Sequence, residues 1–116
     1  MRGIPISVHS ALEVFAAPAI MVAPFLLGFG PAATVLAVLL GVVLLGMALQ
    51  LDSPARTTAL QAHAGFDYVL ALAAAVGGLA VGLIAGEWNA AIFLAGIGAA
   101  MVALTASTRF STARSV

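Results

Sequence analysis

Two pairs of ionisable side chains are the residues of this chain best suited to chemistry. His9 is followed four positions later by Glu13, and His63 is followed at the same spacing by Asp67. In a helix this spacing places both side chains of a pair on one face, one turn apart. Imidazole nitrogens and carboxylate oxygens can share protons or bind a metal ion. These four residues are therefore the candidate ligand or proton-relay residues.

Three interpretations of the two pairs stay open. In the first, each histidine lies at a membrane interface and hydrogen-bonds the acid of its own pair, and no cofactor is bound. In the second, the pairs bind a divalent metal, or the two imidazoles are the axial ligands of a haem. In the third, Glu13 and Asp67 carry protons or ions across the membrane. Such a pathway also needs polar groups in the other half of the membrane, where the sequence offers only Thr34, Glu87 and Asn89.

The elements that must position these pairs are apolar helices. The 116-residue chain is 64% hydrophobic and only 7% charged, too few charges for the surface of a water-soluble domain. Four stretches have about the twenty apolar residues that a helix needs to cross a bilayer. They run from about Val8 to Phe29, Ala32 to Leu49, Ala64 to Ala85 and Trp88 to Ala106. We expect an all-α, four-helix transmembrane bundle, with residues 1–116 as one integral membrane domain in contact with lipid.

Arginine placement predicts the orientation of these helices. With four spans, Arg2, Arg56, Arg109 and Arg114 all fall on one side of the membrane. The positive-inside rule makes that side, and with it both termini, cytoplasmic. The use of Arg without Lys, together with much Ala, Gly and Val, favours a bacterial inner membrane. A cleaved signal peptide is the alternative for the first stretch, but Glu13 within it argues against cleavage.

The two halves of the chain are similar to each other. A shift of 54 residues superimposes the two His/acid pairs and also Gly28 on Gly82 and Met47 on Met101. We expect two tandem helix hairpins: a first repeat over about 8–49, a linker over about 50–63, a second repeat over about 64–106 and a polar tail over 107–116. Because both copies enter the membrane in the same sense, both histidines should lie at one depth near the cytoplasmic face.

One segment carries a family resemblance. Ile4-Pro5, Val8-His9 and Leu12-Glu13 are followed by the run Ala23-Pro24-Phe25-Leu26-Leu27-Gly28-Phe29. In these residues the chain resembles the SPW-repeat membrane proteins, whose repeat has a His-x-x-x-Asp entry and a Ser-Pro-Trp centre. That centre is Ala-Pro-Phe in the first copy and Gly77-Gly78-Leu79 in the second. The resemblance implies two tandem membrane hairpins and brings no established biochemical activity with it.

Small residues recur at intervals of four in the second half. They are Ala74, Gly78, Gly82 and Gly86 in the third stretch, and Ala91, Ala95, Ala99 and Ala103 in the fourth. Small residues at this spacing let membrane helices approach closely. The contact is either internal to the second hairpin or an interface with another subunit.

These features together favour a non-enzymatic protein. We expect a small membrane scaffold or accessory subunit that acts by helix packing, as a homo-oligomer or with another membrane protein. The alternative is a cofactor-binding, metal-binding or ion-conducting protein that uses the two His/acid pairs. No nucleophile–base set can be assembled, the chain has no cysteine, and its zero net charge gives no basis for binding nucleic acid.

Overall fold

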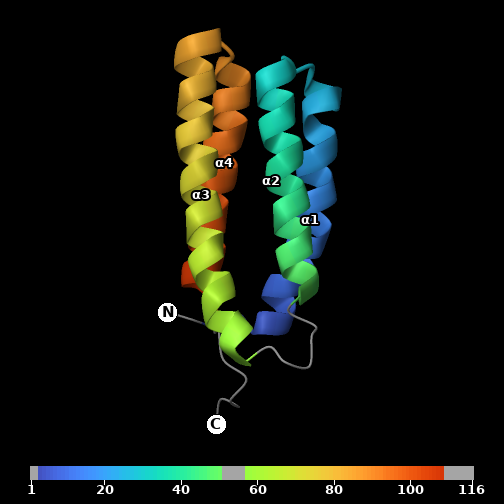
Figure 1. The fold of residues 1–116 in the computed structure, drawn as a ribbon, viewed down its shortest axis with the longest axis vertical. Coiled ribbons are helices and arrows are strands. Elements are labelled where there is room, and N and C mark those ends of the chain that lie inside the picture. The colour runs from blue at the N-terminus through green and yellow to red at the C-terminus, as the bar shows by residue number, and fades with distance from the viewer. Residues whose placement is uncertain (1–2, 51–56, 109–116) are drawn as a thin grey trace.

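The fold is a bundle of four antiparallel helices (Figure 1). The structure, a computed structural model, describes residues 3–50 and 57–108. The helices are α1 (Ile6–Leu27), α2 (Pro31–Gln50), α3 (Thr57–Ala85) and α4 (Trp88–Ala106). All four are long and apolar enough to cross a membrane, as in a multi-pass membrane protein. The predicted all-α architecture of four membrane-length helices is confirmed.

Proline and glycine define the tight turns between paired helices. Pro31 is the first residue of α2, a position that needs no amide donor and suits the fixed φ of proline. Gly28 and Gly86 follow α1 and α3 with φ of 70° and 71°, the left-handed conformation that glycine adopts without strain. The glycine that has the role of Gly28 in the second hairpin is therefore Gly86, whereas the sequence shift pairs Gly28 with Gly82. The stretch from Asp67 to Gly86 is one helical turn longer than the equivalent stretch from Glu13 to Gly28.

The non-helical linker between the two hairpins is shorter than predicted. α3 begins at Thr57 rather than near Ala64, so the second part of the expected linker is helical. Its Ala, Leu and Gln residues favour a helix, and this turn precedes the apolar span of Ala62–Ala85. The four arginines used to predict the orientation lie outside the described residues, as do residues 51–56 and 109–116.

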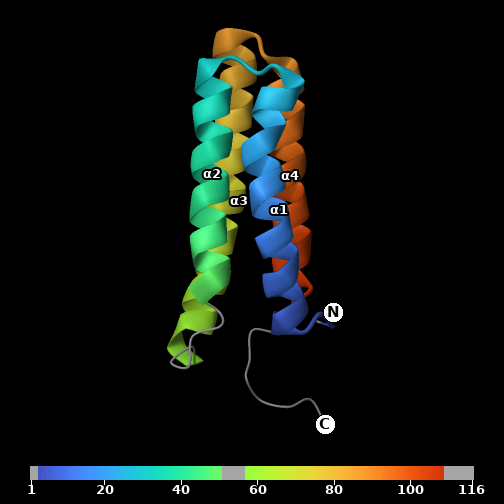
Figure 2. The same ribbon diagram turned by 90° about the vertical axis from the view of Figure 1, so that its right-hand side faces the viewer.

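The hairpins pack tightly within themselves and loosely against each other. Contacts between α1 and α2, and between α3 and α4, are far more extensive than those between α2 and α3, and the contact between α1 and α4 is smaller again. Figure 2 shows α1 beside α4 and α2 beside α3, so α1 and α3 are diagonal across the bundle. We call the end with the Gly28 and Gly86 turns the turn end. The other end, where Ile4 pairs with Thr108, is the terminal end.

Small side chains fill the bundle interior and large ones cover its outside. Four alanines, Ala17, Ala37, Ala71 and Ala74, are buried in the core with Leu40, Leu44 and Leu94. Phe15, Leu26 and Ile84 are 79%, 80% and 86% exposed. A water-soluble bundle buries such residues. This distribution suits a surface in contact with lipid.

Several predicted small residues lie in the contact between α3 and α4. A Cβ atom at Gly78 would be 2.9 Å from the Cβ atom of Leu94, and one at Gly82 would be 3.1 Å from that of Ala91. Gly86 differs, because it lies beyond the end of α3 and a Cβ there would meet nothing within 4 Å. Its positive φ is the feature that requires glycine. Ala95 and Ala99 are exposed on the outer face of the second hairpin.

Candidate functional site

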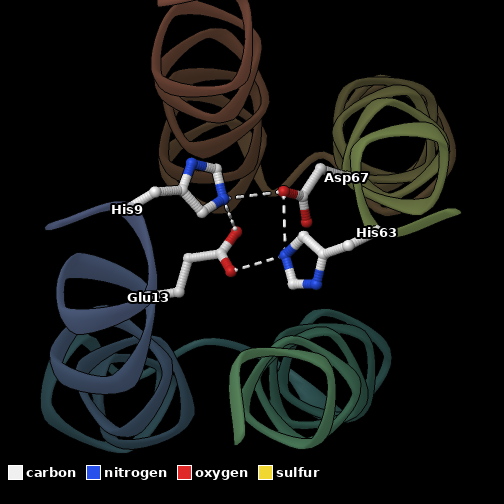
Figure 3. A group of neighbouring side chains, drawn as sticks. All are labelled: His9, Glu13, His63 and Asp67. Carbon is white, nitrogen blue, oxygen red and sulfur yellow. Dashed lines mark hydrogen bonds and ion pairs between the residues drawn. The ribbon is translucent and has the colours of Figure 1, made fainter. Parts of the chain in front are cut away.

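The four candidate residues meet inside the bundle near its terminal end. Figure 3 shows His9 and Glu13 reaching from α1, and His63 and Asp67 reaching from α3, to a common point between the helices. Their residues are 0%, 3%, 4% and 0% exposed in that order. We call them the four-residue centre. Because α1 and α3 are diagonal, only side chains that point toward the bundle axis can meet in this way.

Each histidine contacts the acids of both hairpins. His9 Nε2 lies 3.0 Å from Glu13 Oε2 in its own helix and 2.8 Å from Asp67 Oδ2 in the other hairpin. His63 Nε2 lies 3.1 Å from Asp67 Oδ2 and 2.9 Å from Glu13 Oε1. Imidazoles and carboxylates therefore alternate around a closed ring, in which Glu13 contacts the two histidines through different oxygens and Asp67 contacts both through Oδ2. The expected pairing within each helix is present, and bonds between the hairpins accompany it.

Thr108 determines which nitrogen of His9 carries a proton when the ring is neutral. The Thr108 hydroxyl donates its only proton to the Leu104 carbonyl oxygen, at 2.6 Å. Its oxygen, 2.8 Å from His9 Nδ1, must then accept a hydrogen bond from that nitrogen. In the neutral tautomer Nε2 therefore presents a lone pair to two carboxylate oxygens. These three atoms all accept, so the arrangement requires a proton or another cation among them.

One buried carboxylate oxygen of the centre accepts no hydrogen bond from the described residues. Asp67 Oδ1 is buried and has no hydrogen-bond partner among the residues that the structure describes. The other oxygen, Oδ2, contacts both imidazoles and lies 3.5 Å from Thr105 Oγ1. Buried polar atoms in folded proteins are nearly always paired, so a lone buried carboxylate oxygen beside other ligand atoms marks a place for a ligand.

Charge balance limits what the centre can hold. Two ionised carboxylates carry two negative charges, and burying them without compensation is very unfavourable in an apolar bundle. Two protons, one on each imidazole, neutralise them. One divalent cation bound to two neutral imidazoles does the same. The four donor atoms lie within 4.8 Å of one another, close enough to share one ion.

The surroundings of the centre are apolar. Towards the turn end the interior contains Ala17, Ala74 and Leu40, with other aliphatic residues of the same core. Between α1 and α4 a groove of about 430 Å³ is lined almost wholly by apolar residues, and Glu13 is the acidic residue that reaches it. The centre is thus enclosed on the turn side, and Glu13 connects it with the groove on the loosely packed α1–α4 side.

Two threonines of the site were not identified from the sequence. Residues 107–116 were expected to be a polar tail, and Ser107 and Thr108 at its start are hydrogen-bonded to the bundle. Thr105 is in α4, and both threonines are almost completely buried beside the centre. The backbone N–H of Ile4 also bonds Ser107, at 2.8 Å. The signal available in the sequence was the spacing of four between Met101 and Thr105, which places both on one face of the predicted fourth helix.

The polar residues considered for an outer pathway lie at the turn end, away from the centre. Glu87 Oε1 accepts a hydrogen bond from the Gly30 backbone N–H at 2.5 Å, which joins the two hairpins there. The Thr34 hydroxyl donates to the Phe29 carbonyl, at 3.2 Å. The structure therefore brings the four His/acid residues together and leaves Glu87 and Thr34 in structural contacts at the turn end.

Comparison with known proteins adds no further assignment. No protein-family model matches the chain, and neither the curated proteins nor the solved structures contain a significant match. Functional inference therefore depends on the geometry of the four-residue centre.

Proposed function

We propose that this chain is a non-enzymatic, multi-pass membrane protein that binds a cation in the four-residue centre. The observation that carries the proposal is the position of His9. Its Nδ1 hydrogen donates to Thr108, and its Nε2 faces the oxygens of Glu13 and Asp67. Such an arrangement is stable when a positive charge, borne by protons or by a metal ion, is held among these atoms.

Several features support binding in place rather than conduction through the bundle. The interior between the centre and the turn end is built from alanine and larger aliphatic side chains. An ion that entered this region would lose its hydration without gaining polar ligands. Glu87, at the turn end, is occupied by the Gly30 amide. We therefore favour a site that exchanges its cation with one side of the membrane.

The geometry also favours a bare ion over haem. The ring centroids of His9 and His63 are 5.5 Å apart, with an angle of 78° between the rings. Carboxylate oxygens of Glu13 and Asp67 bridge the two Nε2 atoms, in the space that a porphyrin between axial histidines would need.

Nuclear magnetic resonance of ¹⁵N-histidine-labelled protein, prepared without metal, tests the proposal. We expect signals from protonated imidazoles that exchange slowly with water at neutral pH, and a change in these signals in E13Q. Neutral, rapidly exchanging imidazoles that respond to neither E13Q nor added divalent ions would overturn it. The E87Q variant is the matched control, because it changes a carboxylate at the opposite end of the bundle.

The membrane topology and the repeat belong to the same proposal. We place both termini in the cytoplasm of a bacterial cell and the bundle in its inner membrane, because the four arginines fall on one side of the four spans. The matching His/acid pairs support a tandem repeat related by a two-fold axis along the membrane normal. Membership of the SPW-repeat family stays a prediction. Cysteine accessibility at Ser107 and Asn89, from each side of the membrane, tests the orientation.

A second candidate function is that of a packing scaffold or accessory subunit. Ala95 and Ala99 are exposed and, with Ala75 and Gly98, line a shallow groove of about 440 Å³ on the outer face of α3 and α4. Small residues on a lipid-facing surface support close approach of another helix, from a second copy or another membrane protein. Native mass spectrometry after gentle extraction tests this candidate. Strictly monomeric protein without partners would contradict it.

A further inference from the structure

We infer that the four-residue centre is a mononuclear site for a divalent first-row transition metal. The inference rests on the proposed cation-binding function and names the class of cation. The ligands are Nε2 of His9, Nε2 of His63, and carboxylate oxygens of Glu13 and Asp67. Two ligands come from each hairpin, so a bound ion joins the hairpins near their terminal end.

The spacing of the donor atoms fits a single metal ion. Neighbouring nitrogen and oxygen atoms around the ring are 2.8–3.1 Å apart. Ligands about 2.1 Å from a metal are roughly 3.0 Å apart when they meet at a right angle, and roughly 3.4 Å apart in a tetrahedron. The contacts around the ring are therefore close to those between adjacent metal ligands, and one ligand atom from each of the four residues lies within 4.8 Å of the others. Small side-chain movements would direct these four atoms at one ion.

Asp67 can offer a second carboxylate oxygen to a metal ion. Its Oδ1 is buried and without a partner among the described residues, while Oδ2 contacts both imidazoles. A metal ion at the centre of the ring could bind Asp67 through either oxygen or through both. Coordination would satisfy a buried acceptor whose burial is otherwise unfavourable.

The hydrogen bond from His9 Nδ1 to Thr108 is typical of histidines that bind a metal through Nε2. Metal-bound imidazoles generally donate their second N–H to an acceptor that fixes the tautomer and the ring orientation. Here the acceptor is Thr108 Oγ1, held by its own bond to the Leu104 carbonyl oxygen. Thr108 is thus a positioning residue for the metal ligand and does not touch the ion.

The donor set selects the metal class. Two imidazole nitrogens with two carboxylates favour zinc, iron, cobalt, nickel or manganese, whereas magnesium and calcium prefer sites made wholly of oxygen. One divalent ion also neutralises the two carboxylates with both imidazoles neutral. The site thus needs no further counter-charge.

Cobalt(II) titration of the full-length protein in detergent, after removal of metal with a chelator, tests the assignment. We expect one cobalt per chain, with visible absorption bands of a low-coordinate site that zinc abolishes. The bands should be lost in H63A and in the nearly isosteric E13Q, and retained in E87Q. Helix content measured by circular dichroism identifies variants that remain folded, and E13Q keeps the test decisive if H63A unfolds.

Two outcomes would overturn the metal assignment while leaving cation binding intact. Folded protein that binds no cobalt or zinc, yet shows protonated, slowly exchanging imidazoles, holds protons only. If magnesium or calcium displaces cobalt as well as zinc does, the site binds divalent ions in general and its imidazole nitrogens do not select a transition metal. Cobalt binding that persists in both E13Q and H63A places the metal elsewhere and also contradicts the assignment.

Discussion

Glu13 Oε1 lies 2.9 Å from His63 Nε2, so an acid of the first hairpin bonds a histidine of the second. Both side chains are buried, and contacts between the hairpins are otherwise sparse. This contact lies in the four-residue centre near the terminal end, while the Glu87–Gly30 bond joins the hairpins at the turn end. The energetic coupling of these residues is therefore a direct measure of how the two hairpins are held together.

A double-mutant cycle measures that coupling. Because each single substitution leaves its buried partner uncompensated, we expect E13A and H63A each to lower the free energy of unfolding by about 3 kcal/mol. The double variant should lose less than the sum, with a coupling energy of about 1–3 kcal/mol. Unfolding in mixed detergent micelles provides the values. Additive losses would show that the two side chains do not interact, and E87A combined with H63A is the control pair expected to be additive.

Metal affinity should rise with pH. Binding of one divalent ion replaces the protons that neutralise Glu13 and Asp67 in the metal-free protein, so up to about two protons are released per ion. The described membrane spans of α2 and α4 contribute no ionisable group to the centre; the hydroxyls beside it are those of Thr105 in α4 and of Thr108, which follows α4. The apparent association constant should therefore increase by up to about a hundredfold per pH unit in the acidic range. Competition with a chromophoric chelator across pH measures the slope, and a flat profile would exclude proton exchange.

Replacing Thr108 with valine tests its positioning role. T108V removes the acceptor of the His9 Nδ1 hydrogen while keeping the shape of the side chain. We expect metal affinity to fall by about tenfold or more, as for other outer partners of metal-bound histidines. The control is T34V, which removes a hydroxyl bond to Phe29 at the turn end. If both variants bind cobalt as the unmodified protein does, Thr108 has only a structural role.

The α3–α4 contact predicts opposite effects for two glycines of one helix. A Cβ at Gly98 would lie 2.8 Å from the backbone oxygen of Ala71, which cannot move aside as a flexible side chain can. G98A should therefore destabilise the bundle by about 1–3 kcal/mol. G96A meets nothing within 4 Å and should be neutral or slightly stabilising. Thermal unfolding of both variants checks the difference, and similar midpoints would show that α3 and α4 are farther apart than described.

The number of helices and the identity of the central residues were predictable from the sequence. Long apolar stretches separated by Gly and Pro define the helices, and the His-x-x-x-acid spacing placed each pair on one face. The start of α3 was less predictable, because polar residues beyond the membrane span can continue a helix. The positive φ of Gly86 was not predicted, because Gly86 continues a regular series of small residues that is equally compatible with a helix.

The contacts between hairpins could not be derived from local spacing. Glu13 and His63 are far apart in the sequence, and their distance depends on how α1 and α3 are arranged around the bundle axis. The burial of Thr108 depends in the same way on the backbone bond from Ile4 to Ser107. Serine and threonine near a chain end are compatible with either a buried or an exposed segment, so tertiary packing decides between them.

The equal division of the centre between the hairpins has a consequence for biosynthesis. α1 and α2 emerge from the ribosome first, and the acid and base of α1 lie 3.0 Å apart in the complete bundle. α3 brings the equivalent pair at 3.1 Å. Each hairpin can therefore enter the lipid with its own acid and base paired, and the contacts between the hairpins are added when the second hairpin arrives. A complete ligand set then reports that the whole chain has been inserted and assembled.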